Sequence, residues 1–138
     1  IKDINFSYDR ALNFDGETSV YLQYTCARAA SVLAKARAEG VTFGAAPDLE
    51  PCAAEAELVK QLALFPETVV QAAEKYEPSL ISRFLLDAAK LFNKFYLECK
   101  IMQAEGDVRA FRLALTEATL TTLKNGLGLL GIGVPEKM

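Results

Sequence analysis

The sequence contains no histidine and no tryptophan. Without histidine the chain cannot build a Ser-His-Asp or Cys-His catalytic arrangement, nor a metal site with imidazole ligands. No apolar run reaches the ~18 residues that a membrane-spanning helix needs, and the first residues carry no signal-peptide pattern. We therefore expect no catalytic residue, no metal ligand and no membrane partner in this chain, and a cytoplasmic location.

Cysteine is also scarce. The three cysteines, Cys26, Cys52 and Cys99, lie far apart in sequence and form no Cys-x-x-Cys pair. An odd number of cysteines at such spacings is not a disulfide framework. The pattern predicts reduced thiols in the core of a cytosolic protein.

Charge is present in ordinary amount but is unevenly distributed. The 138 residues include 15 Lys and Arg and 18 Asp and Glu, and the net charge of −3 argues mildly against a nucleic-acid partner. Residues 1–78 carry a net charge of −5 and residues 79–138 one of +2, and seven of the 12 acidic residues of the first part lie between Asp48 and Glu77. A polyanion could meet the C-terminal half while the acidic segment faces away. Ordinary solvated faces explain the same distribution.

Turn and cap signals divide the chain into about five helices. Hydrophobic residues make up 51% of the chain, as in a globular domain, and no segment shows the alternation of a strand. We expect Thr18 or Ser19 to cap the first helix, Asp107 to cap the last and Gly126 to end it. The sequence therefore predicts an all-α helical bundle. Its expected helices cover about 19–38, 52–64, 66–76, 79–103 and 107–125.

The first of these helices has two distinct faces. Its core stripe comprises Leu22, Cys26, Ala29 and Leu33. A second stripe, well over 90° away, comprises Tyr21, Tyr24, Arg28 and Lys35. Aromatic rings stack on unpaired bases and guanidinium groups bind phosphate, so the second stripe is a candidate RNA-binding surface. In the alternative interpretation, the tyrosines pack under a neighbouring segment and Arg28 pairs with an acid.

The helix expected over 79–103 is apolar around most of its circumference, which predicts a place in the middle of the bundle. One stripe is charged and is expected to face solvent. It comprises Arg83, Asp87, Lys90 and Lys94. Tyr96 lies near the end of this helix, and a buried tyrosine with a satisfied hydroxyl is the default interpretation there.

A series of short motifs runs through nearly the whole chain in order. They are Asp15-Gly16-Glu17-Thr18, Tyr21-Leu22-Gln23-Tyr24-Thr25 with Ala27-Arg28, Phe65-Pro66-Glu67, Glu77-Pro78, and the segments 92–99, 112–115, 124–127, 130–132 and 135–138. Together they resemble the all-helical DALR anticodon-binding domain at the C-terminus of class I arginyl-tRNA synthetases. The chain departs from the family pattern at Ser19-Val20, where Gly-Pro is frequent, and at Cys26, where His is frequent. The two catalytic signatures of the class are missing.

The resemblance implies a function and a set of residues. Residues 18–138 would be the anticodon-binding domain, and residues 1–17 the exit from a catalytic domain. Tyr21, Tyr24 and Arg28 would contact the anticodon region of arginine tRNA, and Tyr96 with Met138 would help form a pocket for an extruded base. Every arginine anticodon has cytosine in the middle, so a pocket that reads this base identifies the whole set.

The resemblance also implies what the rest of the protein supplies. Together with the start at Ile1, it leads us to expect a piece of a longer chain, whose catalytic domain acts in cis and uses ATP and magnesium. This piece would need no cofactor, and it would bind neither DNA nor a membrane. Two alternatives stay open: a helical protein–protein interaction module that uses the acidic segment 48–77, and a stand-alone enzyme. The second is disfavoured, because no acid–base pair or ligand cluster can be assembled from the sequence.

Overall fold

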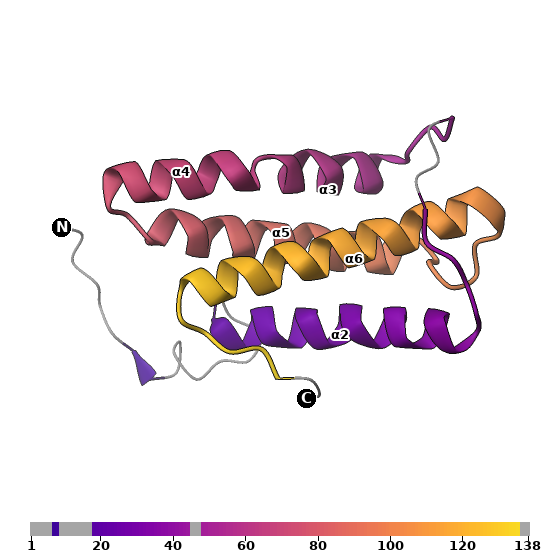
Figure 1. The fold of residues 1–138 in the computed structure, drawn as a ribbon, viewed down its shortest axis with the longest axis horizontal. Coiled ribbons are helices and arrows are strands. Elements are labelled where there is room, and N and C mark those ends of the chain that lie inside the picture. Colours follow the sequence, from indigo (N-terminus) through magenta and orange to yellow (C-terminus); the bar gives the residue numbers. More distant parts are fainter. Residues whose placement is uncertain (1–6, 9–17, 45–47, 136–138) are drawn as a thin grey trace.

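The computed structural model describes residues 7–8, 18–44 and 48–135. Within these ranges the chain forms a bundle of five helices (Figure 1), which confirms the predicted all-α class. They are α2 (Ser19–Ala38), α3 (Ala53–Ala63), α4 (Phe65–Lys75), α5 (Ser79–Glu98) and α6 (Gly106–Leu129). None of these described helices is both long enough and apolar enough to cross a membrane.

Helix α5 forms the centre of the bundle, as its apolar circumference predicts. It packs against α2, α3, α4 and α6. The α3–α4 row lies along one side of the α5–α6 pair, and α2 lies along the other (Figure 1). The charged stripe predicted on α5 is exposed throughout. The predicted core stripe of α2 is buried, with Leu22, Cys26, Ala29 and Leu33 each at most 4% exposed.

The thiols are less uniformly buried than the sequence predicts. Cys26 and Cys99 are core residues, 1% and 4% exposed, but Cys52 is exposed. Cys52 is the residue that precedes α3, with the extended backbone of an N-cap (φ −68°, ψ 167°). Cys52 lies between two exposed residues, Pro51 and Ala53, where the chain enters α3, so the prediction of a core thiol is wrong for Cys52.

Helix α5 ends five residues earlier than predicted. Its last residue is Glu98, and Cys99 has an extended backbone (φ −105°, ψ 111°) while its N–H still donates to the Phe95 carbonyl at 2.8 Å. The turn that follows buries Ile101, which is 4% exposed, in the same core cluster as Phe95. Burying Ile101 requires the chain to leave the helical path, a tertiary effect that local periodicity does not contain.

Both predicted ends of α6 also need correction. The N-cap is Glu105 rather than Asp107, which lies in the first turn, where its charge suits the helix dipole. Gly126 does not end the helix but is buried within it. A Cβ on Gly126 would approach Leu85 Cδ2 to 2.5 Å, so this glycine allows α6 to pack closely on α5. The chain leaves the helix at Gly131, whose φ is 72°, as the Ile132 N–H donates to the Leu127 carbonyl at 2.9 Å.

Candidate functional site

Two tyrosine rings flank one arginine on the surface where α2 meets α5. Arg28 Cζ lies 4.9 Å from the centroid of the Tyr24 ring, one turn earlier on α2, and 5.1 Å from that of the Tyr96 ring on α5. Both distances are those of cation–π contacts. Tyr24 is 50% exposed and Tyr96 is 38% exposed, so solvent reaches the edges of this stack. We call these three residues the Tyr–Arg–Tyr cluster.

The side chain of Asn93 on α5 hydrogen-bonds to the arginine of this cluster and to neighbouring residues of α2. Arg28 Nη1 donates to Asn93 Oδ1 at 2.6 Å. The Asn93 amide nitrogen donates to the Tyr21 hydroxyl at 2.8 Å and to Thr25 Oγ1 at 3.2 Å. Thr25 Oγ1 in turn donates to the Tyr21 carbonyl at 2.9 Å. Asn93 therefore ties α5 to three residues of α2 and orients the guanidinium between the rings.

The structure separates the residues that the sequence predicts on one stripe. Tyr24 and Arg28 are together, as predicted. Tyr21 is half-buried against the core cluster that contains Leu22, so the packing alternative holds for its ring. Lys35 is exposed two turns further along α2. Among the described residues, the side-chain oxygen that accepts from Arg28 is an amide oxygen rather than the carboxylate of the alternative interpretation.

The default interpretation of Tyr96 as a buried tyrosine is wrong, since more than a third of the residue is exposed. Asn93 is the residue that sequence reasoning missed. Its only signal is that it is an uncharged polar residue on α5 that lies off the charged stripe. This signal points to a contact with α2 only once Tyr96, one turn later on α5, is known to face α2.

The C-terminal tail packs near the start of α2. Gln23 Nε2 donates to the Gly133 carbonyl at 2.7 Å, and Ile132 and Val134 pack against the core cluster that contains Leu22. The tail is thus bound to α2 at Gln23, the residue that precedes Tyr24 in sequence. Met138, which the resemblance implies in a base pocket, lies outside the described residues.

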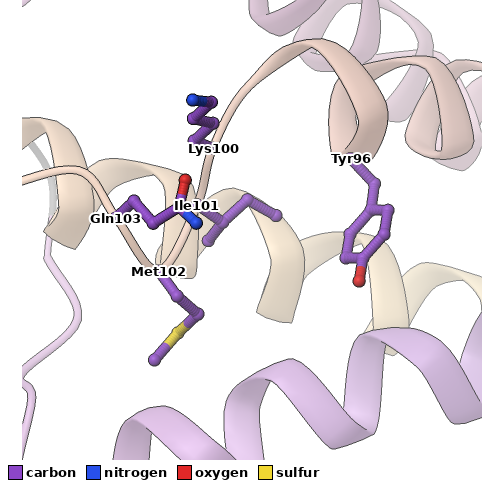
Figure 2. A pocket seen from close by; sticks show the side chains of 5 residues that line it. All are labelled: Tyr96, Lys100, Ile101, Met102 and Gln103. Carbon is purple, nitrogen blue, oxygen red and sulfur yellow. The ribbon is translucent and has the colours of Figure 1, made fainter.

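A pocket of about 230 Å³ opens next to Tyr96, between the end of α5 and the turn that follows it. Figure 2 shows the Tyr96 ring at one side of the pocket and Met102 and Gln103 at the other. Ile101 lies between them and Lys100 supplies a positive charge. The pocket combines an aromatic ring, a thioether and an amide, which suits a flat group that carries hydrogen-bonding atoms.

At the opposite side of α5, an acidic residue is buried under α6. Glu55 is 2% exposed, and its Oε1 accepts from Arg112 Nε at 2.6 Å. Its Oε2 accepts from the Cys52 N–H at 2.8 Å. Burial raises the pKa of Glu55, but the hydrogen bonds from Arg112 and Cys52 outweigh burial and hold this pKa below its usual value. This carboxylate is an internal structural ion and is not available to a partner.

Residues 22–138 match the family model described as the DALR anticodon binding domain. The chain belongs to this family. The chain is 44% identical to the arginine–tRNA ligase of Halothermothrix orenii and 44% identical to that of Clostridioides difficile; in each case 100% of the chain aligns with 24% of the relative. Its fold superimposes on Thermus thermophilus arginyl-tRNA synthetase with a TM-score of 0.87 at 38% identity, over 99% of this chain and 24% of that one.

The DALR domain described here thus spans about a quarter of the length of the relatives it matches, as the 24% coverage shows. Those relatives are full-length arginine–tRNA ligases, and the matched part is their C-terminal region. These matches confirm the resemblance that the sequence motifs carry.

Proposed function

We propose that this DALR domain binds the anticodon stem-loop of arginine tRNA through the Tyr–Arg–Tyr cluster. The observation that carries the proposal is the guanidinium of Arg28, held between two half-exposed tyrosine rings at 4.9 and 5.1 Å. The two rings offer two surfaces on which bases can stack, and the guanidinium between them offers one group that can bind a phosphate. Single-stranded RNA is recognised by this combination, because loop bases stack on aromatic rings while basic groups meet the backbone.

Each residue of the site has a distinct part in this proposal. Tyr24 and Tyr96 present ring faces or edges to unstacked loop bases. Arg28 binds a phosphate of the loop through the N–H groups that Asn93 does not occupy. Tyr21 acts mainly through its hydroxyl, which accepts from Asn93 and so fixes the amide that orients Arg28.

The C-terminal tail completes the proposed site. We propose that Met138 closes a pocket for the middle cytosine of the anticodon, next to Tyr96. The bond from Gln23 to the Gly133 carbonyl supports this, since it ties the tail to α2, next to Tyr24 in sequence, five residues before Met138. Backbone groups of the tail can satisfy the amino group and the carbonyl of cytosine.

The activity of the complete enzyme is part of the proposal. The domain would dock the anticodon so that the 3′ end of the tRNA reaches a catalytic domain in the same chain, which joins arginine to it with ATP and magnesium. Residues 1–17 would connect the two domains. The complete enzyme would act in the cytoplasm. This chain has no catalytic histidine of its own, so its contribution is positional.

The alternative of a protein–protein module that uses acidic segment 48–77 is weakened by the structure. Two of the acids in this segment are engaged internally: Glu55 with Arg112, and Glu57 with Lys94 at 2.7 Å. The charge that this segment presents to a partner is therefore smaller than its composition indicates.

Fluorescence anisotropy with a labelled anticodon stem-loop tests the proposal. The arginine stem-loop should bind more tightly than the same stem-loop with its middle cytosine replaced, over a salt titration. Tyr24→Ala should lose about 1–3 kcal/mol of binding free energy with little change in salt dependence. Arg28→Ala should instead reduce the slope of log affinity against log salt by about 0.7, the share of one phosphate contact in single-stranded RNA.

Two matched controls lie away from the cluster. Tyr76 is a tyrosine that is 92% exposed at the end of α4, and Arg83 is an exposed arginine on the charged stripe of α5. Tyr76→Ala and Arg83→Ala should leave affinity and salt slope nearly unchanged. Equal binding of the arginine stem-loop and the cytosine variant, or equal losses from cluster and control variants, would refute the proposed site.

A further inference from the structure

Two cysteines that are 47 residues apart in sequence meet between α3 and α5. Cys52 Sγ and Cys99 Sγ are 3.3 Å apart. Cys52 precedes α3, and Cys99 follows α5. Each therefore lies at a helix end with an extended backbone, where a small backbone shift does not break a helical turn. From this juxtaposition we infer that Cys52 and Cys99 form a reversible disulfide by exchange with a small-molecule disulfide.

The two thiols differ in a way that suits stepwise exchange. Cys52 is exposed and can meet a disulfide from solution, whereas Cys99 is 4% exposed and lies against Cys52. Burial, followed by the hydrogen bond and charge of Cys52, raises the pKa of Cys99 to about 12. Attack begins at Cys52, because it is the thiol of the pair that a disulfide in solution can reach.

The reaction balances in two steps with a disulfide such as oxidised glutathione. The Cys52 thiolate attacks one sulfur of the small disulfide and releases one thiolate, which leaves a mixed disulfide on Cys52. Cys99 Sγ then attacks Cys52 Sγ, its proton passes to the second leaving thiolate, and the Cys52–Cys99 bond forms. Two protein thiols are oxidised, and the small disulfide is reduced to two thiols.

A metal site is the competing use of the same residues. Ligand atoms of Cys52, Glu55 and Cys99 all lie within 4.8 Å of one another. Both carboxylate oxygens of Glu55, however, already accept hydrogen bonds, one of them from the Arg112 guanidinium. The positive charge of Arg112 against Glu55 opposes a divalent cation, and the two remaining thiols fall short of the four ligands of a structural zinc site. The geometry favours a disulfide over a metal ion.

The third cysteine provides an internal control. Cys26 is 1% exposed in the other core cluster, and burial raises its pKa to about 11. It should stay reduced under conditions that oxidise the pair. The disulfide would tie the start of α3 to the end of α5, three residues after Tyr96.

The test is oxidation of the purified chain in a glutathione redox buffer, followed by intact mass and peptide mapping without reductant. We expect a mass loss of about 2 Da, a peptide that joins Cys52 to Cys99, one alkylatable thiol, and full reversal by dithiothreitol. The crosslink closes a long loop, so the melting temperature of the oxidised chain should rise by roughly 5–10 °C.

Cys52→Ser is the main control variant, because Cys52 is exposed and its replacement should not disturb the core. This variant should show no mass loss and no shift in melting temperature. A persistent glutathione adduct on Cys52 without the crosslink would overturn the inference, as would a crosslink to Cys26. Stoichiometric zinc binding that Cys52→Ser abolishes and that blocks oxidation would establish a metal site instead.

Discussion

Replacing the Asn93 amide by a carboxylate tests how the cluster is built. In the structure Asn93 Oδ1 accepts from Arg28 at 2.6 Å, so the guanidinium is oriented by a neutral group and keeps its full charge. Asn93→Asp retains the acceptor and the shape but places a negative charge against Arg28. The Tyr21 hydroxyl can reverse its role and donate to the carboxylate, because a phenol is both donor and acceptor. We therefore expect the melting temperature to stay close to that of the original chain.

RNA binding should respond differently from stability. With its charge neutralised, Arg28 no longer replaces a counterion on a phosphate, so the salt slope should fall by about 0.7. At 0.1 M salt that slope corresponds to a loss of roughly fivefold in affinity, and the loss grows as the salt concentration falls. Asn93→Ala should instead lower the stability and leave the salt slope nearly unchanged. It leaves the Tyr21 hydroxyl and an Arg28 N–H without this partner and should cost about 1–3 kcal/mol of unfolding free energy.

The assay is anisotropy of a labelled arginine anticodon stem-loop across a salt series, together with thermal melts. Gln61→Glu makes the same amide-to-carboxylate change on α3 and corrects for the added net charge. If Asn93→Asp keeps the original salt slope while Arg28→Ala reduces it, the idea that the amide preserves the charge of Arg28 is refuted. An early melt of Asn93→Asp would instead show that the amide is required for packing.

Two further predictions concern stability. Gly126→Ala should destabilise the chain despite the better helix propensity of alanine, because the new Cβ would lie 2.5 Å from Leu85 Cδ2 and overpacking costs about 1–3 kcal/mol. The control is Gly128→Ala in the same helix, whose new Cβ would meet nothing within 4 Å and which should be neutral or stabilising. Equal melting temperatures of the two variants would refute the clash. The folded-state pKa of Glu55 is lowered from 4.5, so its contribution is present above about pH 4.5 and is lost as the pH falls below that value. Urea titrations should therefore show that Glu55→Gln flattens the acid side of the stability–pH curve, and a curve with unchanged slope would contradict the direction of the shift.

The sequence predicts well the features that depend on a single helix. The bounds of α2, its buried stripe and the exposure of Tyr24 all follow from a 3.6-residue period and from Gly40, which takes a φ of 68° after the helix. It predicts poorly where two helices meet. Gly126 is a terminator signal in isolation and a close-packing residue in the bundle, and only the position of Leu85 decides between these roles.

The candidate site lies between these two cases. A helical wheel shows that Tyr24 and Arg28 are not needed by the core of α2, but it does not show which other surface they meet. Tyr96 is 68 residues beyond Arg28, and its ring reaches the guanidinium only because α5 packs against α2. Asn93 has no partner predictable from sequence, since its side-chain hydrogen bonds to Arg28, Tyr21 and Thr25 cross between these helices.

Net charge is the sequence feature that most misleads about this surface. A net charge of −3 argues against a polyanionic partner. In the structure, however, several of its acids are neutralised by cations of the same chain, whereas Arg28 is held by an amide and keeps its charge. Each of these pairs cancels one cation as well as one acid, so the field that a phosphate would meet at Arg28 is set by the guanidinium itself and not by the net charge. The neutralised acids are Glu39 with Arg109, Glu55 with Arg112, Glu57 with Lys94, and Glu117 with Arg37.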